Sequence, residues 1–157
     1  MSNCAIILAG GEGKRMKSNL PKPMSEVLGK PMLRWVIDSV KSAGVDDICV
    51  VKGYKKECID EFVSSLPFEV ETVYQAERLG TGHAVMMAKD FLEKHSGNVV
   101  ILNGDAPFMD AKTISDALAL HTEKGSVATV ISAKVSDPTG YGRTVSYTHL
   151  RAHETGR

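Results

Sequence analysis

The sequence contains few cysteines and no long hydrophobic run. Its three cysteines, Cys4, Cys49 and Cys58, are odd in number and are never spaced as CxxC, which argues against a disulfide framework and a zinc site. No apolar stretch approaches the roughly 20 residues that a membrane-spanning helix requires. The N-terminus also lacks a cationic segment followed by a signal-peptide core. We therefore expect a cytoplasmic protein with no membrane partner.

The sequence also lacks an excess of charge of either sign. Its 157 residues include 19 basic and 19 acidic side chains. This balance gives no reason to expect nucleic acid as a partner. The length suits one domain, which at this size buries about 70% of the surface of its unfolded chain.

The most informative segment that is present lies near the N-terminus. Residues 8–23 read LAGGEGKRMKSNLPKP and follow a short apolar run at residues 4–8. Glycines allow the backbone to turn tightly and to approach a ligand closely. Backbone N–H groups in such a turn, together with flanking cations, form a cradle for phosphate groups. The residues concerned are Gly10, Gly11, Gly13, Arg15 and Lys22.

Two better-known phosphate loops do not fit this segment. A Walker A loop needs a glycine where Leu8 stands and a Ser or Thr where Arg15 stands. The dinucleotide pattern GxGxxG fits from Gly11 but meets Met16 in place of its last glycine. We expect a nucleoside-triphosphate site of another kind. The alternative is a glycine-rich surface turn that binds nothing.

Hydrophobic periodicity predicts five strands that alternate with four helices. This alternation indicates an α/β fold, a three-layer α/β/α sandwich around a mostly parallel sheet. The apolar run at residues 98–102 is typical of a strand in the middle of such a sheet. The strands are expected at residues 4–8, 47–51, 69–75, 98–102 and 127–133, and the helices at 31–43, around 59–63, at 81–94 and at 114–121.

Three polar segments follow the predicted strands. In parallel sheets, ligands bind beyond the carboxyl ends of the strands, near the point where the strand order reverses. The glycine-rich loop leaves the first strand at this end, Gln75 ends the third strand, and Asp105 follows the fourth. We expect these segments to meet in one crevice.

Asp105 is the candidate metal ligand. It directly follows the apolar strand in NVVILNGDAP, and Mg²⁺ is usually held by one or two carboxylates together with substrate phosphates. The alternative is that Asp105 only caps the turn before Ala106 and Pro107.

Gln75 is the candidate for recognising a base. Its primary amide offers one donor and one acceptor, which match the imide edge of uracil. Gly80 and Thr81 open the next helix and add backbone groups and a hydroxyl. The alternative is that Thr81 caps the helix and that Gln75 is merely solvated. The residues alone leave both interpretations open.

Four motifs in order, LAGGEGKRM…PKP, QAERLGTGHA, LNGDAP and DPTGYGR, resemble those of the sugar-phosphate nucleotidyltransferases. The likeness covers residues 3–143 and is strongest to the pyrophosphorylase domains that make UDP-N-acetylglucosamine. It implies a Rossmann-like fold and Mg²⁺-dependent transfer of a uridylyl group from UTP to N-acetylglucosamine 1-phosphate. The four motifs together are far more specific than any one of them.

The resemblance also implies roles for particular residues. Arg15 and Lys22 would contact the triphosphate, and Asp105 would ligate Mg²⁺; these three form the candidate catalytic set. Gly140 would lie against the acetylated sugar. The residues implied to line the base and ribose are Leu8, Ala9, Gly10 and Gly11, and those implied to hold uracil are Gln75, Gly80 and Thr81.

The likeness ends after Arg143. Residues 144–157 do not read like the family's next strand, and we expect a non-native tail there. The family's C-terminal β-helix acetyltransferase domain, through which its members form homotrimers, is absent from the sequence. We expect little activity from a chain truncated in this way. The alternatives are a nucleotidyltransferase for another base or acceptor, such as a molybdenum-cofactor guanylyltransferase, and a catalytically silent nucleotide-binding fragment.

Overall fold

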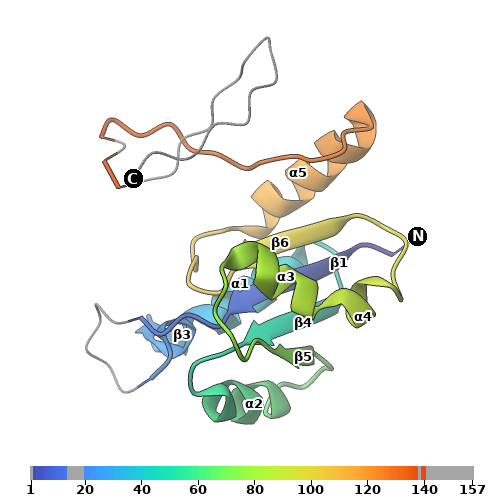
Figure 1. Cartoon of the computed structure of the whole chain (residues 1–157). Coiled ribbons are helices and arrows are strands. Elements are labelled where there is room, and N and C mark those ends of the chain that lie inside the picture. The colour runs from blue at the N-terminus through green and yellow to red at the C-terminus, as the bar shows by residue number, and fades with distance from the viewer. Residues whose placement is uncertain (1, 14–19, 138, 141–157) are drawn as a thin grey trace.

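A parallel sheet of four strands forms the centre of the protein (Figure 1). The computed structural model describes residues 2–13, 20–137 and 139–140. The strands lie in the order β5-β4-β1-β6. Their bounds are β1 Cys4–Ala9, β4 Asp47–Lys52, β5 Glu71–Tyr74 and β6 Val99–Asn103.

The strand order reverses beside β1. From β1 the chain moves outward to β4 and β5, and it then crosses back to place β6 on the other side of β1. Cys4 is therefore paired with Asp47 of β4 on one side and with Val99 of β6 on the other. A reversal of this kind opens a crevice at the carboxyl ends of the two strands concerned. The glycine-rich loop leaves β1 at that end.

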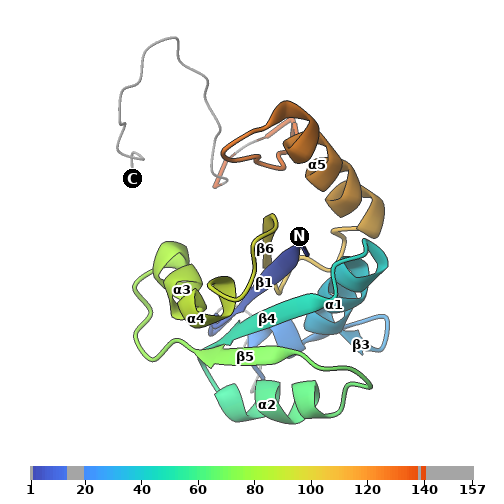
Figure 2. The ribbon, with the colours of Figure 1, turned by 90° about the vertical axis from the view of Figure 1, so that its right-hand side faces the viewer.

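Helices cover both faces of the sheet, which confirms the predicted three-layer arrangement (Figure 2). Because side chains alternate along a strand, Ile7 of β1 packs toward one layer of helices and Ile6 toward the other. Each such fully buried side chain stabilises the fold by roughly 1.5–3 kcal/mol. The first layer holds α1 Met32–Ser42, α2 Lys56–Ser64 and α5 Ala111–Lys124; the second holds α3 Thr81–Met87 and α4 Lys89–Leu92.

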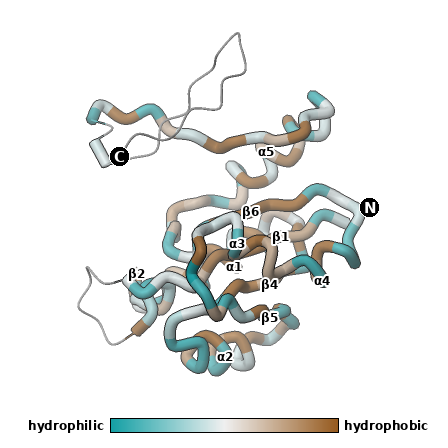
Figure 3. The backbone as a smooth tube through the Cα atoms, in the orientation of Figure 1, coloured by the Kyte–Doolittle hydropathy of each residue, from teal (hydrophilic) through white to brown (hydrophobic). Residues whose placement is uncertain are grey.

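The central strands are continuous apolar runs, as strands with helices on both faces require (Figure 3). Cys4, Ile6 and Ile7 are completely buried in β1, and so are Cys49 and Val50 in β4. No helix within the described residues is long and apolar enough to cross a membrane.

Two expectations about the last strands are wrong. In the described part of the chain, β6 pairs with β1 alone and forms an edge, so that Val99 and Ile101 remain 41% and 50% exposed. Residues 127–133, expected to be a fifth strand, form no ladder, and Val127 and Val130 are exposed. β-branched residues favour extended backbone, but a strand also needs a paired neighbour, which local propensity does not supply.

The helix predicted at residues 81–94 is divided in two. The break lies at Ala88, whose φ of −90° and ψ of 19° depart from helical values. Ala88 and Phe91 are buried against Cys4 and Ile6 of the sheet. The direction of α4 is thus set by the packing of these side chains, which periodicity alone does not reveal.

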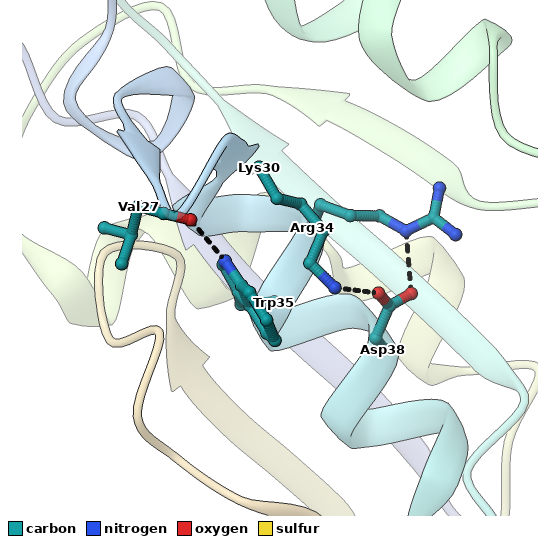
Figure 4. A network of polar contacts seen from close by, with 5 residues as sticks. All are labelled: Val27, Lys30, Arg34, Trp35 and Asp38. Carbon is teal, nitrogen blue, oxygen red and sulfur yellow. Dashed lines mark hydrogen bonds and ion pairs between the residues drawn. The ribbon is translucent and has the colours of Figure 1, made fainter.

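A short hairpin precedes α1 and joins it to the glycine-rich region. It consists of β2 Glu26–Val27 and β3 Lys30–Pro31, with positive φ angles of 52° at Leu28 and 72° at Gly29 in its turn. The Trp35 indole of α1 donates a hydrogen bond of 2.9 Å to the Val27 carbonyl (Figure 4).

Asp38 on α1 also holds the hairpin in place through hydrogen bonds. The Asp38 carboxylate accepts hydrogen bonds of 2.7 Å from Lys30 Nζ and from Arg34 Nε (Figure 4). The Lys30 ammonium also lies 3.6 Å from the centre of the Trp35 ring. These contacts hold the hairpin on α1 and thereby position the short 3-10 helix η2 Lys22–Met24 just before it.

Candidate functional site

Two glycines meet where β1 and β4 end. A Cβ on Gly53 would lie 2.8 Å from both Cα and O of Gly10, closer than real Cβ atoms approach. The Tyr54 N–H donates a hydrogen bond of 3.3 Å to the Gly10 carbonyl. Gly10 therefore has a packing role that the sequence did not suggest. Gly11 differs, because no described residue lies within 4 Å of the place its Cβ would take.

Lys22 and Asp105 form an ion pair across the crevice. Lys22 Nζ lies 2.5 Å from Oδ2 of Asp105, and the two side chains are 41% and 32% exposed. Gly104 brings Asp105 to this position, since its N–H donates a hydrogen bond of 2.9 Å to the Leu8 carbonyl. Lys22 is held beside Gly13, whose Cβ would stand 2.7 Å from that of Lys22.

The ion pair also bears on the alternative interpretation of Asp105. Within the described residues, Lys22 is the one hydrogen-bond partner of the Asp105 carboxylate. The turn that follows is closed by its backbone, because the Ala106 N–H donates to the Asn103 carbonyl at 3.2 Å. Capping of this turn by the Asp105 side chain is not seen.

Gln75 is buried, with only 6% of its surface exposed. Its amide Nε2 donates hydrogen bonds to the Gly80 carbonyl at 3.2 Å and to Nδ1 of His83 at 3.0 Å. The interpretation of Gln75 as a merely solvated side chain is therefore wrong. Capping by Thr81 is wrong too, because Gly80 occupies the N-cap position of α3 without any side-chain cap.

The remaining predicted residues differ in how far they are buried. Leu8 is partly buried, whereas Ala9 is completely buried in the core and only its backbone can face a ligand. Thr81 is exposed at the start of α3. Gly140 is exposed, and no described residue lies within 4 Å of its Cβ position. Arg15 lies outside the described residues.

The described residues suit a divalent cation only when a nucleotide supplies further ligands. Among the described residues, no group of three or more His, Cys, Asp or Glu side chains is placed to hold a metal. Asp105 offers a partly exposed carboxylate beside the glycine-rich loop. One carboxylate suffices for Mg²⁺ when substrate phosphates supply further oxygen ligands. The site thus suits a metal that arrives with a nucleotide.

Sequence reasoning missed three contacts around the crevice. Gly53 could have been found as a glycine two residues after a predicted strand, and His83 as a polar residue in the first turn of a predicted helix. No sequence pattern predicts the third contact, an ion pair between Arg78 and Glu12. Arg78 Nη1 lies 2.9 Å from Oε2 of Glu12, and the pair joins the glycine-rich loop to the segment before α3. A hollow of about 310 Å³ opens beside Gln75 and is lined by Tyr54, Lys56 and Arg78 among others.

Comparison with known proteins identifies the family. The sequence model of the nucleotidyl transferase family matches residues 4–154. The chain belongs to this family. A protein of Acetivibrio thermocellus described as bifunctional protein GlmU is 45% identical over 141 residues, which are 90% of this chain and 30% of that protein. The protein of the same description from Clostridium beijerinckii is 47% identical over 145 residues, 92% of this chain and 31% of its own length.

Solved structures of nucleotidyltransferases share the fold. UDP-glucose pyrophosphorylase of Acinetobacter baumannii matches with a TM-score of 0.66 at 20% identity, over 80% of this chain and 54% of that one. CTP:phosphocholine cytidylyltransferase of Streptococcus pneumoniae matches with a TM-score of 0.57 at 27% identity, over 67% and 46% of the two chains. The α/β nucleotidyltransferase fold and the predicted family resemblance are thereby confirmed.

These matches also define how much of a relative the chain represents. It spans about 30% of the length of the GlmU proteins described above. Membership of the family supports nucleotidyl transfer as the general chemistry.

Proposed function

We propose that this chain forms the nucleotide-binding part of an enzyme that transfers a uridylyl group from UTP to N-acetylglucosamine 1-phosphate. The products are UDP-N-acetylglucosamine and pyrophosphate. The observation that carries the proposal is the Lys22–Asp105 ion pair, which places a cation and a carboxylate together beside Gly13 of the glycine-rich loop. The identity of 45% and 47% with two GlmU proteins supports the choice of substrates.

In the proposed reaction, a phosphate oxygen of the sugar 1-phosphate attacks the α-phosphorus of UTP. The bond from that phosphorus to the bridging oxygen breaks, and the electron pair leaves with pyrophosphate. Such transfers need little covalent help from the protein, so positioning and charge neutralisation supply most of the catalysis.

The residues of this chain divide that work among them. Gln75 and Gly80 hold the base, and Gly11, with no described residue within 4 Å of its Cβ position, admits the nucleotide. Lys22 and Arg15 offset the negative charge of the triphosphate, and a flexible lysine side chain can follow a phosphate as charge shifts toward the leaving group.

Asp105 would hold Mg²⁺ together with the phosphates of the nucleotide. The cation would neutralise phosphate charge and orient the triphosphate. Lys22 must then exchange its carboxylate partner for a phosphate oxygen. Both of its partners are anionic, so the exchange keeps the ammonium paired throughout.

Calorimetry on the folded chain tests this proposal directly. UTP is titrated into concentrated protein with MgCl₂ and, in parallel, with EDTA. We expect weak binding of UTP that depends on Mg²⁺ and that Asp105→Asn removes. Asp116→Asn is the matched control, because Asp116 pairs with Lys112 on the exposed surface of α5. Absence of Mg²⁺-dependent UTP binding by folded material overturns the proposal.

Two further measurements separate the alternatives. If GTP binds more tightly than UTP, the site serves another base, as in a guanylyltransferase. We expect pyrophosphate release with N-acetylglucosamine 1-phosphate to be low in the 157-residue chain but above that of Asp105→Asn. If UTP binds and release does not exceed that of this variant, the chain acts as a nucleotide-binding fragment.

A further inference from the structure

The donor side of the Gln75 amide is fully engaged. An amide nitrogen carries two hydrogens and accepts none. One is donated to the Gly80 carbonyl and the other to Nδ1 of His83. Because Nε2 of Gln75 can only donate, Nδ1 of His83 accepts, and a neutral His83 ring then carries its own proton on Nε2.

The acceptor side of the same amide is available. Oε1 of Gln75 points toward Gly10, 3.3 Å from the position that a Cβ there would take. No described residue donates a hydrogen bond to it, and no described side-chain nitrogen or oxygen is both fully buried and without a partner. Oε1 is therefore not fully buried, and it is left to accept a hydrogen bond beside the hollow that Gln75 helps to line.

We propose that His83 is a positioning residue that fixes the Gln75 amide with Oε1 toward the ligand, and that this orientation selects bases carrying a ring N–H. The inference rests on the proposed function, because it concerns the base bound at the same site. Uracil has a hydrogen on N3 and can donate it to Oε1. Cytosine has a lone pair at N3 and would face the oxygen with an acceptor.

The selectivity depends on preventing rotation of the amide. Rotated by half a turn, Gln75 would offer Nε2 to cytosine, but its oxygen would then face the Gly80 carbonyl, and His83 would have to move its ring proton from Nε2 to Nδ1 to keep its contact. The Gly80 carbonyl and this change of tautomer thus oppose the rotated state, and removing His83 leaves only the carbonyl. A single neutral hydrogen bond is worth enough to alter a ratio of affinities about threefold to tenfold.

The test compares UTP and CTP, each with Mg²⁺, by calorimetry at pH 8. The wild-type chain is expected to bind UTP more tightly than CTP. His83→Leu should lower this preference about threefold to tenfold. In His83→Asn, an amide oxygen stands near the place of Nδ1 and should restore the preference. His121→Leu is the matched control, since His121 on α5 contacts Thr129 and lies outside the crevice.

The outcomes distinguish this inference from the function on which it rests. If the wild-type chain binds no UTP, the proposed function fails and this inference fails with it. If the wild-type chain prefers UTP and His83→Leu keeps the same preference, only the role of His83 is refuted.

A second measurement does not depend on the variants being folded. Nitrogen-15 NMR of the wild-type protein reports which ring nitrogen of His83 carries the proton. We expect the tautomer protonated on Nε2, with Nδ1 as an acceptor. A proton on Nδ1 would reverse the direction of the bond to Gln75 and overturn the inference.

Discussion

Nζ of Lys22 lies 2.5 Å from Oδ2 of Asp105, although 83 residues separate them in the sequence. Lys22 follows the glycine-rich loop, and Asp105 follows the carboxyl end of β6. The strand-order reversal at β1 brings these two segments to opposite sides of one crevice. Before ligand binds, each charge is neutralised by the other. A nucleotide with its metal offers both of them new partners.

Removing the lysine should strengthen the binding of Mg²⁺ to the chain without nucleotide. In Lys22→Met, the ammonium no longer competes for the Asp105 carboxylate. Because the pair is partly exposed, we expect a gain in Mg²⁺ affinity of only about twofold to fivefold, smaller at high salt. Titration of MgCl₂ by calorimetry measures it. Lys41→Met, which removes a remote ion pair with Asp46, should change nothing. An unaltered Mg²⁺ affinity in Lys22→Met would mean that the lysine does not compete with the metal for the Asp105 carboxylate.

Substitution of the charged site residues should reduce catalysis in the longer, active enzyme that the proposed function implies. Asp105→Asn and Arg15→Ala are each expected to lower kcat/KM by about 100-fold or more, because each removes charge that stabilises the phosphates in the transition state. Pyrophosphate release under steady-state conditions provides the measurement. Asp116→Asn serves again as the control. Near-normal rates would remove the substituted residue from the mechanism.

Gly53→Ala should destabilise the fold. Its Cβ would meet the backbone of Gly10 at 2.8 Å, and backbone cannot move aside as a flexible side chain can. We expect the free energy of unfolding to fall by about 1–3 kcal/mol, measured by urea denaturation. Gly82→Ala is the contrasting variant, because nothing lies within 4 Å of its Cβ position inside α3. There, alanine should stabilise the helix by up to about 1 kcal/mol. Equal stability of the two variants would contradict the contact between Gly10 and Gly53.

The buried thiols should make stability fall at alkaline pH. Burial raises the pKa of Cys49 to about 12, and the negative charge of Glu71 adds to the effect. Burial also raises the pKa of Cys4. The native state therefore keeps protons that the unfolded chain loses. The stabilisation from Cys49 is complete below pH 9.0, the ordinary thiol value, and is lost as the pH rises toward about 12.

Thermal unfolding between pH 8 and pH 10.5 tests this expectation. The melting temperature of the wild-type chain should decline as the pH rises, and that of Cys49→Ala should decline less steeply. Cys58→Ala is the control, since Cys58 is only partly buried and its slope should match the wild type. Parallel curves for all three proteins would show that Cys49 does not contribute to the alkaline loss of stability.

Local patterns were sufficient for most of the elements. The stripe of Leu33, Val36, Ile37 and Val40 predicted α1, and the runs at residues 4–8 and 47–51 predicted β1 and β4. Such patterns succeed where an element is buried along one face or on both faces, since burial imposes the period of the structure. They failed at residues 127–133, where the β-branched residues have no neighbouring strand to pair with in the described chain.

The candidate site was predictable only in part, for a related reason. Gly10, Lys22, Gln75 and Asp105 were proposed because glycines, cations, amides and acids in loops beyond the carboxyl ends of parallel strands are typical of ligand sites. Their partners were not found, because a contact such as Gln75 with His83 depends on the path of the connection between β5 and α3, which no local pattern specifies.

The sequence by itself determined the parallel α/β architecture, the family and the residue types gathered at the carboxyl ends of the strands. These follow from periodicity and short motifs, which are properties of neighbouring residues. The tertiary structure alone decided that Gly53 lies on Gly10, that Lys22 faces Asp105 and that His83 contacts the Gln75 amide. Those relationships join segments that meet only after the sheet has formed, so the geometry of packing, and not local preference, sets them.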